Sequence, residues 1–389
     1  MEEHLDAKKT KREILNKRNL SQFKNITMKL YFIIILGLLC HISCNQEKKQ
    51  TLITGNIPNL PDGIMYLYED NGTNKIDSIQ TKKGKFNFIY HWKNNEPVYL
   101  GLNHVDNHNI FTYIGFPTKA KYKGAPLEQT RFLSDSTIII NGKTFDNTPT
   151  SFPENVKSIT LFSPIITGKQ TDALYHIDED LFEHITPKTV SIIKEKLIEY
   201  PFSYHLLYKI SENKNSFSAL QTQDLLHSFK GEITESNTYK KLYAYNEKRF
   251  NEKNILLPLL ENNRHTKEEI LNKKYKKHLI VFWASWCGPC RQEIPLLKKT
   301  FASYAKETEF ISISIDEDQS AWQKALAQEN MSWKQLIADK KNSAYETLQI
   351  RFKLNGAIPY TVLVDNDLHI IASSTGLSSE KDLVDLIKK

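Results

Sequence analysis

A multi-domain chain is predicted by three patterns that follow one another along its 389 residues. Short alternating runs come first and are typical of antiparallel strands, apolar stripes at helical spacing come next, and a strand–helix–strand–helix order with a final hairpin and helix ends the chain. That last order predicts an α/β fold, in which helices flank a mixed sheet. We therefore expect a small antiparallel β-domain at 51–145, a mainly helical connecting region at 146–254 and the α/β domain at 255–389.

The β-domain is predicted from runs in which apolar and polar residues alternate between Asn, Gly and Asp turns. Residues 63–68 and 85–90 are such runs, and Ser136–Ile140 ends at Asn141-Gly142, a strong turn signal. Together they are typical of a small sandwich or barrel. His104 and His108 flank Asp106 in a way that could suggest a metal site, but no further ligand is evident. We interpret this stretch as a polar hairpin loop and expect no metal.

The middle region is predicted to be helical because its apolar residues recur at helical spacing. The stripes are Val190, Ile193 and Leu197, then Leu225, Leu226 and Phe229, with Pro201 as a break between them. Core packing explains these stripes better than a cofactor pocket. The chain has no phosphate-binding loop and no nucleotide-binding fingerprint, so we expect no cofactor.

The α/β domain is predicted element by element from 279 onwards. An apolar run precedes a helical pattern, a β-rich run and two further helical patterns. Two strands then flank Asp365-Asn366-Asp367, a hairpin turn, and Gly376 precedes a closing helix. The expected strands are Leu279–Trp283, Glu309–Ile315, Thr361–Val364 and Leu368–Ala372; the expected helices are Pro289–Ala305, one around Trp322–Leu326, Ser343–Ile350 and one containing Leu383, Val384 and Ile387.

The two cysteines at the end of the first strand, Cys287 and Cys290, are the main candidates for chemistry. They flank Gly288-Pro289, and proline suits the first turn of a helix because it has no N–H to leave unpaired. Cys287 would then lie at a helix N-terminus, where free N–H groups and the helix dipole favour the thiolate. The thiolate is the attacking species in disulfide chemistry, so Cys287 is the expected nucleophile. Cys290, one turn away, can close a disulfide with it.

Two other interpretations of this pair are weaker. A metal site needs about four ligands, and one CxxC supplies two. A purely structural disulfide would close a very short loop and gain little from chain entropy. The other cysteines, Cys40 and Cys44, lie in the N-terminal segment, so the reactive pair stands without structural disulfides beside it. This usage is typical of a redox enzyme of an oxidising compartment.

The segment from Phe282 to Arg291, followed by Glu293-Ile294-Pro295, resembles the active site of thioredoxin-like proteins, specifically the bacterial envelope type known as TlpA/ResA. The resemblance covers 255–389 and implies a thioredoxin fold with thiol–disulfide oxidoreductase activity, for which the redox-active disulfide replaces a cofactor. Thr54-Gly55 through Gly84-Lys85-Phe86 resembles a β-domain of unknown function often found ahead of such domains in bacterial lipoproteins.

The resemblance also implies roles for neighbouring residues. Ile358-Pro359 matches the family's cis-proline loop, whose backbone pairs with the substrate chain, and Trp286, Gly288 and Pro289 are expected to bind the substrate beside it. Tyr360, also an expected substrate-binding residue, stands where the family usually has a small or hydroxyl residue, which leaves the substrate preference open. Many cytosolic thioredoxins have a buried aspartate where this chain has Val281. Glu293, one turn after Cys290, is therefore the expected proton acceptor, with a helix-dipole role as the alternative.

The resemblance favours a reductase of protein disulfides, with apocytochrome c as a frequent family substrate and an inner-membrane thiol donor as the source of electrons. One rival is a peroxiredoxin-type peroxidase, but that family needs a threonine where this chain has Ala284. Another is a non-enzymatic envelope lipoprotein that binds a ligand through its β-domain. Loss of function in Cys287→Ser would favour the enzyme.

An export signal is predicted near the N-terminus. Lys29 precedes the apolar run Leu30–Cys40, which is long enough for a signal-peptide core and too short to span a bilayer. Ser43-Cys44 follows and resembles a lipoprotein cleavage site, although His41 replaces the usual leucine. We therefore expect a cytosolic extension and signal peptide at 1–43, lipidation at Cys44, a polar tether at 44–50 and a periplasm-facing protein anchored to the membrane. Met28 is a second candidate initiation site.

Charge argues against nucleic acid as a partner. The formal charge of the chain is +7, and residues 1–43 hold eight Lys or Arg against four Asp or Glu, which leaves about +3 for the rest. The lysine-rich stretch 273–277 is interpreted as a solvated approach to a strand rather than a lipid contact.

Overall fold

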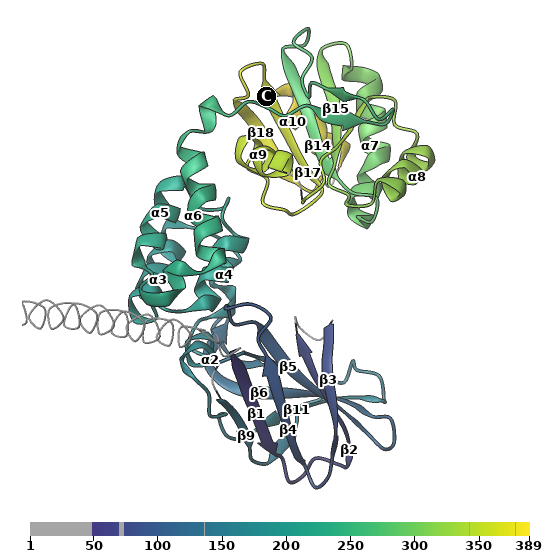
Figure 1. Cartoon of the computed structure of the whole chain (residues 1–389). Helices are drawn as coiled ribbons and strands as arrows, with labels where there is room; N and C mark the ends of the chain where they lie inside the picture. The colour runs from purple at the N-terminus through teal and green to yellow at the C-terminus, as the bar shows by residue number, and fades with distance from the viewer. Residues whose placement is uncertain (1–48, 70–73, 136, 342, 378) are drawn as a thin grey trace, which may run out of the picture. The chain divides into compact units, whose positions relative to one another are not determined.

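The computed structural model of the chain describes residues 49–69, 74–135, 137–341, 343–377 and 379–389 (Figure 1). The signal peptide and the lipidation site expected at 1–44 lie outside these residues. Within the described ranges, no helix combines the length and apolar character needed to cross a membrane.

The N-terminal part of the described chain is a two-sheet β-domain. The small sheet has the order β4-β1-β9, formed by β1 (Gln50–Asn56), β4 (Lys85–His91) and β9 (Thr137–Asn141). The large sheet has the order β10-β11-β6-β5-β2-β3, with β7 on β6 and β8 on β5. Its strands are β2 (Gly63–Glu69), β3 (Asn74–Thr81), β5 (Tyr99–Asp106), β6 (Phe111–Tyr122), β7 (Ala125–Gln129), β8 (Arg131–Leu133), β10 (Thr144–Asp146) and β11 (Val156–Leu161).

Alternation of side chains along these strands builds the core between the two sheets. In β4, for example, Phe86, Phe88 and Tyr90 are buried while their neighbours are exposed. Most pairs are antiparallel, but β1 pairs with β9 and β11 pairs with β6 in parallel. Because β11 begins at Val156, strand pairing continues past the expected boundary at residue 145.

The next segment is mainly helical. It contains α2 (Lys169–Leu174), η1 (Glu179–Phe182), α3 (Pro187–Glu199), α4 (Tyr204–Glu212), α5 (Ala219–Ser228), η2 (Gly231–Glu235), α6 (Asn237–Phe250) and η3 (Glu252–Asn254). Side chains cap the helices, since Thr186 and Ser218 each accept an N–H of the first turn in a capping box. The predicted stripe residues Ile193, Leu197, Leu225 and Leu226 are all buried, as core packing requires.

The C-terminal part is the predicted α/β fold. Its sheet has the order β13-β12-β16-β15-β14-β17-β18, with β14 parallel to β15 and antiparallel to β17. The strands are β12 (Leu260–Asn262), β13 (Lys267–Glu268), β14 (Lys277–Trp283), β15 (Thr308–Ser314), β16 (Lys334–Ile337), β17 (Tyr360–Asp365) and β18 (Ile370–Thr375); the helices are α7 (Gly288–Tyr304), α8 (Gln319–Glu329), α9 (Ser343–Phe352) and α10 (Glu380–Lys388).

Strand β14 lies inside this sheet with both faces covered. Leu279 and Val281 pack with Leu297 of α7 and with Leu383 of α10. Ile280 and Phe282 belong to the cluster on the other face, which contains Trp322 of α8 and Leu348 and Phe352 of α9. A strand buried on both faces is apolar throughout rather than alternating, which is why 279–283 is one continuous run. The strand carries the chain to the cysteines at its carboxyl end.

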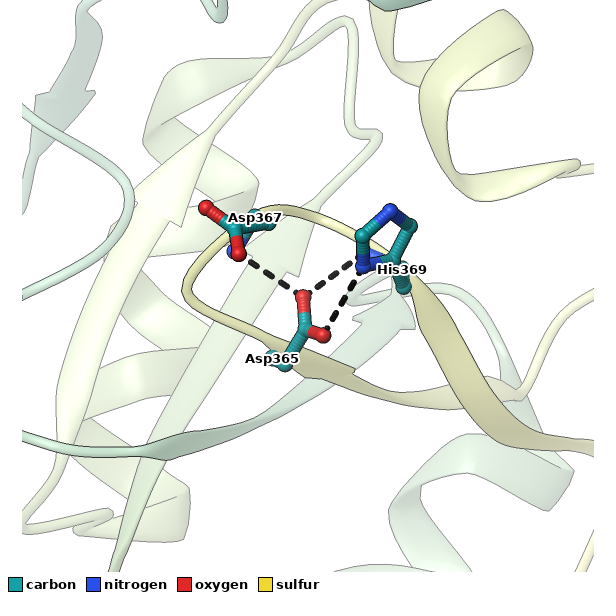
Figure 2. Close-up of side chains that lie close together, drawn as sticks. All are labelled: Asp365, Asp367 and His369. Carbon is teal, nitrogen blue, oxygen red and sulfur yellow. Dashed lines mark hydrogen bonds and ion pairs between the residues drawn. The ribbon is translucent and has the colours of Figure 1, made fainter.

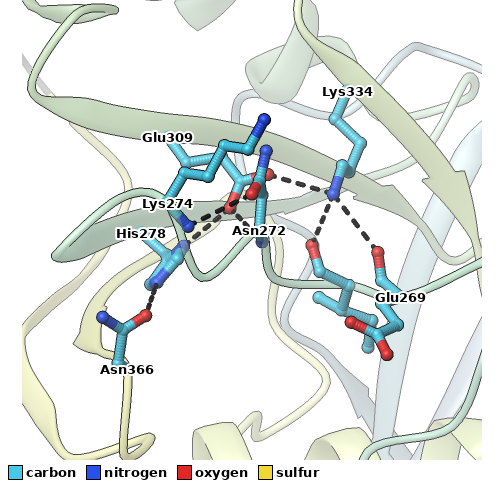
Figure 3. A network of polar contacts seen from close by, with 8 residues as sticks. Glu269, Asn272, Lys274, His278, Glu309, Lys334 and Asn366 are labelled. Atoms are coloured by element: carbon cyan, nitrogen blue, oxygen red, sulfur yellow. Dashed lines mark hydrogen bonds and ion pairs between the residues drawn. The ribbon is translucent and has the colours of Figure 1, made fainter.

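A buried polar network links the amino-terminal end of β14 to neighbouring segments (Figure 3). His278 on β14 lies 2.7 Å from Glu309 Oε2 through its Nδ1 atom and 3.0 Å from Asn366 Oδ1 through Nε2. Glu309 on β15 also accepts the Asn272 N–H at 2.7 Å and pairs with Lys334 of β16 at 3.0 Å. Burial alone would raise the pKa of Glu309, but the hydrogen bonds from His278, Asn272 and Lys334 lower it below its usual value.

Candidate redox site

Cys287 is the N-cap residue of helix α7, directly before Gly288. Its backbone is extended, and its sulfur accepts the N–H of Cys290 at 3.2 Å, so the sulfur itself caps the helix. Cys287 and Cys290 form a disulfide with their Cα atoms 5.3 Å apart. The sulfur of Cys287 therefore lies where a helix N-terminus favours negative charge, as the spacing of the motif predicts.

A buried aspartate holds the loop between β14 and α7. Asp316, which follows β15, accepts Ser285 N–H at 2.8 Å and Ser285 Oγ–H at 2.7 Å, and it also accepts Ser314 Oγ–H at 2.6 Å. Sequence reasoning missed this residue. The available signal was its place directly after β15, because β14 and its parallel neighbour end at the same edge of the sheet. Asp316 thus fixes the loop that presents Trp286 and Cys287.

The disulfide itself is nearly enclosed, and the residues around it provide the accessible surface. Cys287 is 5% exposed and Cys290 is 2% exposed, so the two residues differ little in exposure. Trp286 is 63% exposed, and Lys340 Nζ lies 5.4 Å from the centre of its ring. A Cβ placed on Gly288 would meet no atom within 4 Å, so the backbone of the motif is open to an approaching chain there. Trp286, Gly288 and Pro289 therefore adjoin the disulfide.

The proline loop lies beside the nucleophilic sulfur. The Ile358–Pro359 bond is cis, as the resemblance implies. Cys287 Sγ is 3.8 Å from the carbonyl oxygen of Ile358. Because a disulfide sulfur carries no proton, this distance is a contact in the oxidised form rather than a hydrogen bond. A chain bound along this loop would lie next to Cys287.

Tyr360 does not present its side chain to a substrate. The residue is 8% exposed, and its hydroxyl donates to Phe352 O at 2.9 Å. Its ring packs 6.1 Å from that of Phe282, on the face of the sheet that α9 covers. This placement contradicts the substrate contact expected for the Tyr360 side chain, because the side of β17 on which a residue falls depends on strand register.

Glu293 is a buried carboxyl group on α7, one turn after Cys290. It is 7% exposed, and Oε1 accepts the Leu377 N–H at 2.6 Å. Its other oxygen, Oε2, has no hydrogen-bond partner among the described residues. Burial raises the pKa of Glu293 above its usual value, against the lowering effect of the Leu377 N–H. A buried carboxyl group with a raised pKa close to a reacting thiol is suited to proton transfer.

An exposed cluster on the β17–β18 turn does not add a metal centre (Figure 2). The ligand atoms of Asp365, Asp367 and His369 lie within 4.8 Å of one another. Asp365 Oδ1 accepts the N–H groups of Asp367 and His369 at 2.9 and 2.8 Å, and Oδ2 is 3.0 Å from His369 Nδ1. These bonds close the predicted hairpin turn and account for the cluster. Likewise, Asp106 Oδ1 accepts the N–H groups of His108 and Ile110 in the β5–β6 turn. The polar loop expected at 104–108 is only partly correct, because β5 extends to Asp106 and His104 is fully buried within that strand.

A mixed sheet with a CxxC disulfide at a helix N-terminus, beside a cis-proline loop, defines a thioredoxin-like domain. Residues 275–370 match the sequence model of a thioredoxin-like family, and residues 51–130 match a domain of unknown function, DUF4369. The chain therefore contains a thioredoxin-like domain, which supports thiol–disulfide oxidoreductase activity, and an N-terminal DUF4369 domain.

Individual relatives match the C-terminal part. The thiol-disulfide oxidoreductase ResA of Bacillus cereus is 26% identical over 124 residues, which cover 32% of this chain and 68% of the relative. The thioredoxin-like protein YneN of Bacillus subtilis is 40% identical over 48 residues, which cover 12% of this chain and 28% of the relative. A solved thiol-disulfide oxidoreductase from Bacteroides fragilis is 26% identical and aligns with 34% of this chain and 96% of its own, with a TM-score of 0.29.

Proposed function

We propose that this oxidoreductase is a membrane-anchored, periplasm-facing reductase of protein disulfides. One observation carries the catalytic part of the proposal: the Cys287 sulfur caps α7, accepts the Cys290 N–H at 3.2 Å and adjoins the Ile358 carbonyl oxygen. This arrangement favours a thiolate at the position where a substrate chain would lie. The anchor and the orientation are inferred from the sequence around Cys44.

The reaction proceeds in two exchanges from the reduced protein. The Cys287 thiolate attacks one sulfur of the substrate disulfide, a mixed disulfide forms and the other substrate sulfur leaves as a thiolate. Cys290 then attacks the Cys287 sulfur, its proton passes to Glu293, and the first substrate sulfur leaves as a thiolate. The substrate gains two electrons and the protein ends with the Cys287–Cys290 disulfide.

The direction of the reaction and its partners follow from the resemblance. The Gly288-Pro289 pair and Ile358 resemble reducing members, so we infer reduction rather than oxidation of substrates. Apocytochrome c is the proposed substrate, and an inner-membrane thiol donor is proposed to restore the dithiol.

Exchange with a model peptide disulfide tests the chemistry. The reduced wild-type chain should reduce the peptide, and Cys290→Ser should accumulate the mixed disulfide. Cys287→Ser should neither reduce the peptide nor form the mixed disulfide. Equilibration with glutathione tests the direction, because a reductase should have a potential well below about −200 mV. A mixed disulfide that forms through Cys290, or a potential as high as that of disulfide-forming oxidants, would contradict the proposal. Trapping with Cys290→Ala in intact cells would identify the substrates.

A further inference from the structure

Besides the Nε1–H of Trp283, two buried oxygen atoms near the site lack a hydrogen-bond partner within the described part of the chain. They are Glu293 Oε2 on α7 and Thr361 Oγ on β17. Thr361 is 1% exposed, so water at the surface does not satisfy its hydroxyl. Buried hydroxyl and carboxyl oxygens are rarely left without a partner, and such groups gather at functional sites.

The two residues face the same layer of the domain. Thr361 lies opposite Val281 in the β14–β17 pair and two residues before Leu363. Val281 and Leu363 pack in one cluster with Leu297 of α7. Successive residues of a strand point to opposite faces, and Tyr360 belongs to the other face, so Thr361 points toward α7. Glu293 lies one turn before Leu297 on that helix and is buried in this layer.

The turn after β18 brings the carboxyl group to the start of β17. Gly376 N–H donates to Pro359 O at 2.9 Å, and the next amide, that of Leu377, donates to Glu293 Oε1 at 2.6 Å. A Cβ placed on Gly376 would lie 3.9 Å from Glu293 Oε1. Consecutive amides therefore hold the carboxyl group next to Pro359, two residues before Thr361.

We propose that Thr361 is a positioning residue for Glu293, whose free oxygen Oε2 accepts the Thr361 hydroxyl directly or through one water molecule. The inference rests on the proposed role of Glu293 as proton acceptor. When Cys290 attacks the Cys287 sulfur, the Cys290–Cys287 bond forms, the bond to substrate breaks and the Cys290 proton passes to the carboxylate. A hydroxyl donor stabilises that carboxylate before the transfer and keeps it aimed at Cys290.

Other charged groups near Glu293 are engaged elsewhere. On α7, Arg291 pairs with Glu329 of α8 at 2.7 Å, and Lys299 pairs with Glu380 of α10 at 2.6 Å. On β17, the Tyr360 hydroxyl is bonded on the opposite face. Among the described residues of α7 and its N-cap, the titratable groups on the cysteine side of Glu293 that have no such ion pair are, in the reduced protein, Cys290 and Cys287.

Thr361→Val tests this role because it keeps the shape of the side chain and removes the hydroxyl. Loss of one hydrogen bond to the carboxylate should raise the pKa of Glu293. The acid limb of the pH profile for the rate of mixed-disulfide resolution should therefore move to higher pH by about one unit. Thr361→Ser should restore the wild-type profile. The matched control is Thr300→Val on α7, which is equally buried but donates to Leu296 O at 2.9 Å, and it should leave the profile unchanged.

Two further measurements make the result decisive. In the Glu293→Gln background, Thr361→Val should change nothing; the same shift in that background would overturn the inference. Carbon NMR titration of Glu293 in the reduced full chain does not depend on turnover, and Thr361→Val should raise the measured pKa. An unchanged titration would reject the role of Thr361 even if the chain reduces disulfides, whereas a shifted titration in a chain without exchange activity would reject only the proposed function. Circular dichroism confirms that each variant is folded.

Discussion

The position of one sulfur at the N-cap of α7 decides which cysteine reacts first. Cys287 accepts an amide N–H there, whereas Cys290 lies inside the helix, and the two differ little in exposure. Thiolate stabilisation rather than access should therefore separate them. With limiting alkylating reagent, the reduced protein should be labelled at Cys287 before Cys290, as measured by peptide mass spectrometry. Preferential labelling of Cys290 would overturn the assignment.

Glu293→Gln should slow resolution more than the first attack. The carboxyl group is one turn from Cys290, while the Cys287 thiolate already has the helix N-terminus to stabilise it. Glutamine keeps the acceptor for the Leu377 N–H and removes the base. Stopped-flow measurements should show a preserved initial rate, a resolution rate lower by about tenfold or more and an accumulating mixed disulfide. If the variant matched the wild type at neutral pH in the rate of the first attack and in the rate of resolution, Glu293 would have only a structural role.

Residues of the site that lie close together in sequence could be predicted from their spacing. Among those supplied by distant segments, only the cis-proline loop at Ile358-Pro359 could be predicted, through the family resemblance. The CxxC spacing predicts the helix start at Cys287, and helical periodicity places Glu293 beside Cys290. Asp316 and the Leu377 amide enter the site through strand order and a turn, which one sequence does not reveal. Tyr360 was misplaced for the same reason, because register decides which face of β17 it joins.

At the scale of elements, the β14–α7 loop depends on Asp316. Its carboxylate is 1% exposed and accepts three hydrogen bonds, so Asp316→Ala leaves buried donors unpaired. We expect the free energy of unfolding of the C-terminal domain to fall by about 2–3 kcal/mol. The comparison is Ser285→Ala, which removes one of these bonds and should cost about 1 kcal/mol. Denaturant titration followed by tryptophan fluorescence measures both, because four of the five tryptophans lie at 283–333. Equal losses in the two variants would contradict this account.

The network at the other end of β14 should control stability in acid without affecting the cysteines. The pKa of Glu309 is lower in the folded chain than in the unfolded chain. Its carboxylate therefore contributes fully to the free energy of unfolding above the unfolded-state pKa of about 4.3, and this contribution is lost as the pH falls through the folded-state pKa. Glu309→Gln should therefore be less stable by about 1–3 kcal/mol at pH 7, and the difference should shrink between about pH 5 and pH 3.

The control for this variant is Glu380→Gln, which breaks an exposed pair with Lys299 and should change stability little. Alkylation of Cys287 in reduced Glu309→Gln should proceed at the wild-type rate, because His278 and the motif lie at opposite ends of β14. A difference in stability that grows in acid would reject the role given to the Glu309 carboxylate.

Long, strongly patterned elements were predictable, and short ones were not. The predicted strands of the last domain match β14, β15, β17 and β18 within a few residues, because each is rich in β-branched or aromatic residues. Strands β12, β13 and β16 contain two to four residues, too few to show a pattern, and they exist because a neighbouring strand supplies hydrogen bonds. The Asn141-Gly142 signal did mark a turn, but the turn joins β9 and β10, which belong to different sheets.

At the scale of the whole molecule, the order of a β-domain, a helical segment and an α/β domain follows from the sequence because each has its own hydrophobic core. One cluster lies between the two β-sheets, a second joins the helices, and two others cover the faces of the last sheet. Separate cores are built by local patterns, so local patterns are enough to reveal them. The redox disulfide lies in the last of these parts.

The anchor expected at Cys44 determines where that chemistry takes place. The run Leu30–Cys40 is too short to remain as a membrane span, Ser43 is small, and only five residues separate Cys44 from the start of β1 at Gln50. Metabolic labelling with a fatty-acid analogue should therefore modify the wild-type chain and should be lost in Cys44→Ala. The matched control, Cys40→Ala, alters the other N-terminal cysteine and should retain the label. Label that persists in Cys44→Ala, or a wild-type chain found in the cytosolic fraction, would reject both the anchor and the envelope location.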